Sequence, residues 1–111
     1  MSGLDPTQSV LEAAMRGATL RQSLLTANLA NANTPGYQAQ DVNFQSQLQS
    51  AINSGQSSSL DTMSFRPSST TGAVNSDQQS AALAENGLLY DTLAQILTAH
   101  NTTLEYAFGT K

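Results

Sequence analysis

Two long segments, residues 6–32 and 76–108, limit the fold more than any other feature of the sequence. Both repeat apolar residues at helical spacing, and neither contains an internal proline. The first segment ends just before Pro35 and Gly36, which fit the two central positions of a type II turn. At 1.5 Å per residue the helices would be about 40 Å and about 50 Å long. The sequence therefore predicts a mainly α fold in which two long terminal helices pack as a coiled-coil-like pair.

Each predicted helix begins with a capping signal. Asp5 can cap the first helix, Pro6 suits its first position, and Gln8 lies three residues after Asp5, as a capping box requires. Ser76 and Gln79 have the same spacing at the second helix. We therefore expect Asp5 and Ser76 to be the N-caps.

A short amphipathic helix is predicted over residues 41–53, with Asp41 as its cap. Its apolar face consists of Phe44, Leu48, Ala51 and Ile52. The following segment, up to Gly72, is rich in Ser, Thr, Gly and Gln and predicts an irregular polar loop. Within that loop, a brief strand could form where apolar residues alternate, at Leu60, Met63 and Phe65.

The chain therefore divides into three parts. Residues 1–37 hold the N-terminal helix and its turn, residues 38–73 form a short middle segment, and residues 74–111 hold the C-terminal helix. We expect the first and last parts to make the helical core together.

The apolar residues of both long helices extend beyond one face. The main stripe of the first helix consists of Val10, Leu11, Ala14, Met15, Ala18, Leu25, Leu29 and Ala32. The main stripe of the second consists of Leu83, Leu89, Tyr90, Leu93, Ala94, Ile96, Leu97, Leu104, Ala107 and Phe108. Leu20, Leu24, Leu88 and Tyr106 lie outside these stripes, and a helix that is apolar beyond one face is usually buried on more than one side. Since the middle segment offers few apolar residues, we predict that these four residues contact neighbouring subunits.

The charges exclude some partners and differ between the two helices. Only four Lys and Arg residues occur in 111, too few to bind a row of nucleic-acid phosphates. The first helix carries Arg16 and Arg21 against Glu12, whereas the second carries only acidic residues. Two helices whose net charges have opposite sign favour pairing with each other. The alternative is that both charged faces are solvated and that their charges differ by chance.

Several other classes of protein lack support in the sequence. With no cysteine, the chain has no disulfide framework and no thiolate metal site. No apolar run approaches a membrane span, so we expect no direct membrane insertion. The N-terminus has no basic segment followed by an apolar stretch, so we also expect no cleaved secretory signal.

Nor do the residues needed for catalysis converge. His100 is the single histidine and falls within the apolar stripe of the last helix, where we expect a packed or interface role. Glu85 and Asp91 are six residues apart and do not share a helix face, so they form no carboxylate pair. We predict a protein that is not an enzyme and has no catalytic residue, cofactor or metal.

Three asparagines, Asn28, Asn86 and Asn101, fall in or at the edge of an apolar stripe. A buried asparagine destabilises the fold unless its amide is paired, yet one such residue can fix helix register and partner choice. We favour this register role over the alternative, a hydrated seam between the helices.

Two motifs resemble the axial proteins of the bacterial flagellum, the family of rod, hook and hook-associated subunits. The first is the turn that ends the N-terminal helix, and its matching residues are Asn28, Asn31, Thr34, Pro35, Gly36 and Tyr37. The second lies in the last helix and includes Leu83, Glu85, Asn86, Tyr90 and Leu97. The last helix is most similar to that of a proximal rod subunit, because the Arg-x-Tyr or Arg-x-Phe element of other members is missing.

This chain departs from the family pattern at two places. Its middle segment is short, and the turn before the last helix runs Gly72-Ala73-Val74-Asn75-Ser76-Asp77 where Gly-Asn-Thr-Val-Asp is common.

The resemblance implies a structural subunit of the proximal rod of the flagellar basal body. Such subunits leave the cytoplasm unfolded through the flagellar type III export apparatus, without signal cleavage, and assemble in the periplasm. Their terminal helices form a tube that transmits torque and surrounds the export channel. The implied partners are further copies of the chain, other rod proteins and the adaptor at the membrane ring. The alternatives are another rod-family subunit or a soluble helical adaptor or chaperone that does not polymerise.

Overall fold

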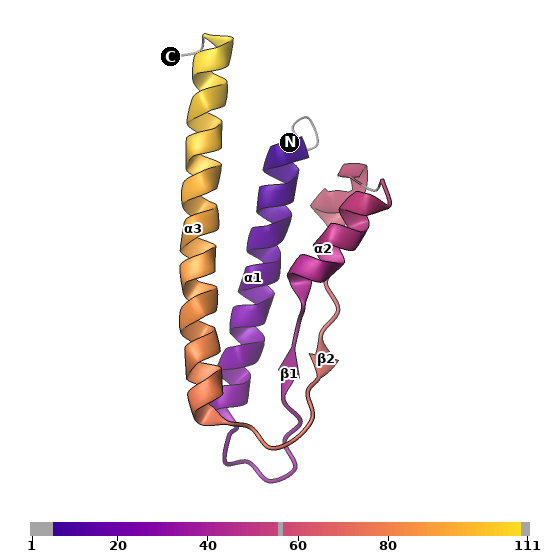
Figure 1. Ribbon diagram of the computed structural model, residues 1–111, viewed down its shortest axis with the longest axis vertical. Coiled ribbons are helices and arrows are strands. Elements are labelled where there is room, and N and C mark those ends of the chain that lie inside the picture. Colours follow the sequence, from indigo (N-terminus) through magenta and orange to yellow (C-terminus); the bar gives the residue numbers. More distant parts are fainter. Residues whose placement is uncertain (1–5, 56, 110–111) are drawn as a thin grey trace.

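The computed structural model describes residues 6–55 and 57–109 and contains two long terminal helices that run antiparallel (Figure 1). In chain order the elements are α1 (Pro6–Ala30), β1 (Gln40–Asp41), α2 (Phe44–Asn53), η2 (Ser57–Thr62, a 3₁₀ helix), β2 (Ser68–Ser69) and α3 (Ser76–Phe108). The molecule is elongated, with extents of 58 × 28 × 17 Å. The predicted mainly α class and the pairing of the terminal helices are confirmed.

The helix α1 lies in the middle of the molecule. On one side it packs against α3, and on the other against β1, α2 and η2 (Figure 1). Among the described helices and strands, α3 packs against α1 alone. One long helix is therefore covered on two sides and the other on one.

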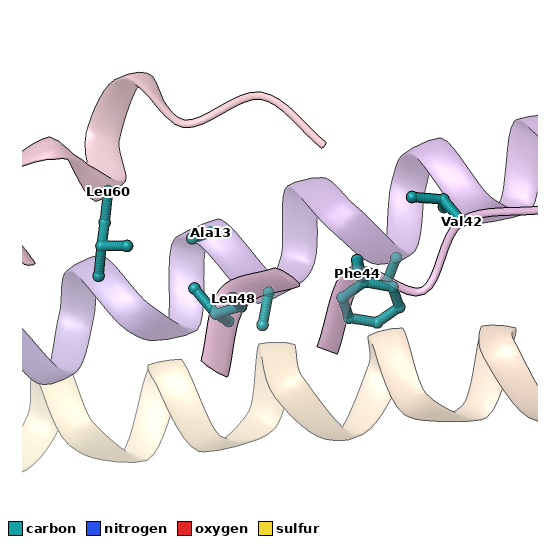
Figure 2. Packing of buried hydrophobic residues seen from close by; sticks show 7 residues of the cluster. Ala13, Val42, Phe44, Leu48 and Leu60 are labelled. Carbon is teal, nitrogen blue, oxygen red and sulfur yellow. The ribbon is translucent and has the colours of Figure 1, made fainter. Parts of the chain in front are cut away.

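The middle segment covers α1 more completely than its polar composition suggested. Four of its apolar side chains, Val42, Phe44, Leu48 and Leu60, pack on α1 and are at most 6% exposed (Figure 2). The ring of Phe44 also meets Phe65 edge to face, with centroids 6.1 Å apart. The expectation that this segment could provide little cover is thus wrong for α1.

Small residues on α1 explain why so few side chains are sufficient. The face of α1 toward the middle segment includes Ala13, Gly17 and Ala18, which leave little apolar surface to cover. A Cβ atom added at Gly17 would lie 2.6 Å from Phe44, closer than real Cβ contacts. Glycine at this position therefore allows the Phe44 ring to lie directly against the α1 backbone.

Asp41 does not cap α2, as the sequence had suggested. The N-cap is Asn43, whose side-chain oxygen accepts a hydrogen bond from the backbone N–H of Ser46 at 3.2 Å. The Asp41 carboxylate instead accepts two hydrogen bonds from Arg21, at 2.8 and 3.1 Å, and ties β1 to α1. The hydrogen bond that Arg21 donates to Asp41 raises the pKa of Arg21, which therefore stays charged throughout the physiological range.

Other predicted boundaries shift by one or two residues or change type. The N-cap of α3 is Asn75 rather than Ser76, and it accepts from the N–H of Gln78 at 3.0 Å. The helix α1 ends at Ala30, and the predicted cap Asp5 lies outside the described residues. No strand forms at Leu60–Phe65: η2 ends at Thr62, and the strand that pairs with β1 is β2.

The close packing at Gly17 can be tested with Gly17→Ala. The added methyl group must displace Phe44, so we expect the free energy of unfolding to fall by about 1–3 kcal/mol. Urea titration followed by circular dichroism, in an osmolyte such as TMAO that favours the folded state, measures this change. Gly87→Ala in α3 is the matched control, because a Cβ there meets no atom within 4 Å. Equal effects of the two substitutions would contradict this account of the core.

Candidate assembly surface

The helix α3 exposes most of its apolar side chains. Of its residues, only Asn86 is buried. The large hydrophobic residues that it exposes are Leu88, Tyr90, Ile96, Tyr106 and Phe108, with exposed fractions between 38% and 74%. A single helix in contact with only one neighbour cannot bury so broad an apolar surface. These side chains point to more than one side of α3, so we take the whole exposed apolar surface of the helix as the candidate functional site and call it the α3 face.

The four predicted subunit contacts fall into two groups. Leu88 and Tyr106 lie on the α3 face and are 69% and 70% exposed. Leu20 and Leu24 are half-buried and pack against the core of the chain itself. Their role in contacts between subunits stays a prediction, and the exposed pair is the better placed for it.

The seam between α1 and α3 contains two asparagine–glutamine pairs. Asn86 donates from Nδ2 to the Ala18 carbonyl at 2.7 Å and to Oε1 of Gln22 at 2.9 Å. Asn28, on α1, donates to Oε1 of Gln79, on α3, at 3.1 Å. Each helix thus supplies one asparagine to a glutamine of the other. These directional bonds require one alignment of the helices, which supports the predicted register role of Asn28 and Asn86.

The two asparagines differ in how fully they are paired. Asn28 Nδ2 also donates to the Gln40 carbonyl at 2.7 Å, and its Oδ1 accepts from the N–H of Gln40 at 3.0 Å and the hydroxyl of Tyr37 at 3.4 Å. By contrast, Oδ1 of Asn86 is buried and has no hydrogen-bond partner among the described residues. An unpaired buried acceptor is destabilising by about 1–3 kcal/mol. The fold therefore tolerates a local loss of stability at Asn86.

The turn motif closes α1 and leads the chain towards β1. Asn31 donates from Nδ2 to the Ala27 carbonyl, and Thr34 donates from its hydroxyl to Oδ1 of Asn31. The N–H of Tyr37 donates to the Thr34 carbonyl at 3.2 Å, which places Pro35 and Gly36 at the central positions of the turn, as predicted. Gly36 has a φ of +77°, a conformation that favours glycine. The motif residues thus build the turn, and Asn28 ties it to the helical pair.

The residues of the second motif lie at different depths on α3. Leu83 and Leu97 are half-buried, and Asn86 is buried in the seam. Glu85 and Tyr90 are exposed. The motif therefore combines residues of the seam with residues of the α3 face.

An open groove of about 630 Å³ runs between α1 and α3 beside the α3 face. Its walls include Ala18, Thr19 and Gln22 from α1 and Leu83, Ala84, Asn86, Gly87, Leu88, Tyr90 and Asp91 from α3. We call this the α1–α3 groove. It lies beside the polar seam and includes two residues of the α3 face, Leu88 and Tyr90.

The charges of α3 are all acidic. Its ionisable carboxylates are Asp77, Glu85, Asp91 and Glu105, and the helix contains no Lys or Arg. Arg21 of α1 forms its bidentate pair with Asp41, and Arg16 donates to the Leu60 carbonyl, so both arginines are held by the middle segment. The negative charge of Glu85 also raises the pKa of Arg21, but by less than Asp41 does.

Within residues 6–55 and 57–109, no group of three or more His, Cys, Asp or Glu side chains could hold a metal ion. None of the helices in the same residues is long and apolar enough to cross a membrane. His100 is half-buried on α3.

Sequence reasoning missed the partners of the two asparagines. Gln22 was not singled out, and Gln79 was assigned to a capping box. A signal was present: an antiparallel alignment that places Asn28 opposite Gln79 also places Gln22 opposite Asn86. Pairing polar residues across two apolar stripes could therefore have identified the seam.

Comparison with known proteins supports the family that the two motifs predict. A family model for flagella basal body rod proteins matches residues 10–38, which span most of α1 and the turn. The flagellar basal body rod protein FlgB of Yersinia ruckeri is 35% identical over 103 residues, covering 69% of this chain and 74% of that protein. FlgB of Yersinia enterocolitica is 32% identical with the same coverage. FlgB of Escherichia coli K12 is 42% identical over 52 residues, covering 47% of this chain and 38% of that protein.

The unequal pairing of the asparagines predicts unequal effects of Asn28→Leu and Asn86→Leu. Asn28→Leu leaves the N–H of Gln40 without its acceptor, and we expect it to lower the free energy of unfolding by about 1–3 kcal/mol. Asn86→Leu also removes an unpaired acceptor, so we expect stability within about 1 kcal/mol of the original. Urea titration under identical osmolyte conditions compares them. A larger loss from Asn86→Leu would show that its hydrogen bonds outweigh the unpaired oxygen.

Proposed function

Because this chain belongs to the FlgB family of flagellar basal body rod proteins, we propose that it is a structural subunit of the proximal rod. In this proposal the terminal helices of many subunits pack into a tube that surrounds the export channel and transmits torque. The observation that carries the proposal is the α3 face, because the one helix that packs against α3 leaves large apolar side chains exposed. Neighbouring subunits would supply the missing cover.

The shape of the chain supports a role in transmitting torque. Paired helices along the long axis of a 58 Å molecule resist bending, and the asparagine–glutamine pairs resist sliding of one helix along the other. A subunit whose register is fixed in this way can pass a force to its neighbours without changing shape. The role we propose is therefore mechanical rather than catalytic.

The proposed partners are further copies of the chain, other rod proteins and the adaptor at the membrane ring. We also propose passage through the flagellar export apparatus in an unfolded state, followed by assembly in the periplasm. The small core supports this route, because several of its buried residues are alanines, which contribute little to the stability of an isolated subunit. Such a chain unfolds readily before export and gains its stability on assembly.

Deletion of the gene in its host bacterium tests the proposed function. We expect cells without rod, hook or filament that keep the membrane ring and do not swim. Electron microscopy of isolated basal bodies and swimming in soft agar measure these outcomes, and a plasmid copy should restore both. Normal swimming of a strain with no second copy of the gene would rule out the rod role.

The behaviour of the isolated chain separates a rod subunit from an adaptor that does not polymerise. With the α3 face uncovered, we expect low helix content and a broad melting curve at micromolar concentration. Circular dichroism combined with sedimentation velocity measures both properties. A monomer that is stable and melts in one sharp transition would favour the adaptor.

A further inference from the structure

Gly87 has no reason within its own chain to be a glycine. Glycine in a helix interior is less stable than alanine by roughly 1 kcal/mol. At Gly17 this penalty is explained, because a Cβ atom would collide with Phe44. At Gly87 a Cβ atom would meet no atom of the described chain within 4 Å. The space above Gly87 is thus open, and it belongs to the α1–α3 groove.

This groove has the shape that a helix needs for close approach. Its walls include Thr19 on α1 and Ala84 and Gly87 on α3, so each helix places small residues among the larger ones of the groove. The distance between packed helix axes depends on the side chains at the contact, and small residues allow the shortest distances. Leu88, 69% exposed, stands at the edge of the groove and can cover one side of an inserted helix.

The polar residues of the groove differ in whether an occupant could reach them. Asn86 is 1% exposed, lines the groove, and carries a buried Oδ1 with no partner among the described residues. Asp91 places a carboxylate on the same groove. A groove wall with an exposed carboxylate and no cation from its own helix favours a partner that brings positive charge.

Charge also distinguishes between possible occupants. A second copy of α3 would bring acidic residues only. The arginines of α1 in a second copy are held by its own middle segment, since Arg21 pairs with Asp41 and Arg16 donates to Leu60. A third arginine, Arg66, lies between η2 and β2 and not on a helix. A different subunit with a basic helix therefore fits the groove better than another copy of this chain.

We propose that the α1–α3 groove receives a helix of a different rod subunit, with a small or apolar face over Gly87 and a Lys or Arg side chain against Asp91. This inference rests on the proposed rod function and adds the site and the chemistry of one partner. Gly87 keeps the groove open, and Asp91 selects a basic helix over an acidic one. Asn86 serves both the register of the subunit and the floor of the groove.

The test compares Gly87→Leu with Gly87→Ala and Gln49→Leu in cells that carry no other copy of the gene. We expect Gly87→Leu to fill the groove, leave helix content equal or higher, and abolish swimming and rod assembly. Gly87→Ala adds a single methyl group and should reduce swimming less. Gln49→Leu places the same side chain on the exposed face of α2, outside the groove, and should leave swimming unchanged. Circular dichroism in TMAO and the amount of exported protein confirm that each variant folds and leaves the cell.

Selection for suppressors identifies the occupant. Asp91→Lys should stop swimming, and restored swimmers should carry a change from Lys or Arg to an acidic residue in a helix of another rod subunit. Suppressors at the arginines of this chain, or a dimer of the pure protein that Gly87→Leu dissociates, would assign the groove to a second copy and overturn the proposal. Normal swimming of both Gly87→Leu and Asp91→Lys would remove the groove from assembly altogether. Failure of the rod function itself is distinguished by the deletion strain, which would then swim.

Discussion

The structure depends on α1 being buried on two sides at once. Every other described helix packs against it, and β1 does so as well. This is possible because α1 presents small residues toward the middle segment, where Gly17 allows Phe44 to lie against the backbone, and polar amides toward α3. Without α1, α3 would have no partner and the middle segment would have no surface on which to order. The N-terminal helix is therefore the scaffold of the chain, and α3 is the element left available for contacts with other subunits.

The sequence determines the long elements well and their local ends less well. Proline-free apolar repeats predicted both terminal helices, and Pro35 with Gly36 predicted the turn. The caps were misplaced because two residues that can cap stand close together, as Asn75 and Ser76 do. At α2 the choice was made by a distant residue: Arg21 binds Asp41 and leaves Asn43 as the cap. Such a contact between residues far apart in the sequence cannot be inferred from capping preferences alone.

The amount of cover on α1 was misjudged for a similar reason. Counting apolar residues in the middle segment underestimated how well this segment buries α1. The area that must be covered depends on the side chains of α1 itself. Where that surface consists of alanine and glycine, a few side chains such as Phe44 and Leu48 are enough. For the candidate site, periodicity identified Leu88 and Tyr106 as exposed and Asn86 as a seam residue. The open space above Gly87 is a property of two helices together, so it could be recognised only in the structure.

The properties of the seam and of the α3 face are physically linked. A seam rich in leucine would give a stable hairpin but would leave its register weakly defined, whereas directional amide bonds define the register at a cost in stability. The unpaired Oδ1 of Asn86 is one such cost, and the glycine at position 87 is another. Neither of these two losses of stability is offset by further contacts within the described residues. In an assembly, however, burial of the α3 face by neighbours supplies the stability that the hairpin lacks, and a fixed register presents Leu88 and Tyr106 to those neighbours in constant positions. Local instability and dependence on partners are thus two consequences of the same arrangement, in which the subunit is completed only by assembly.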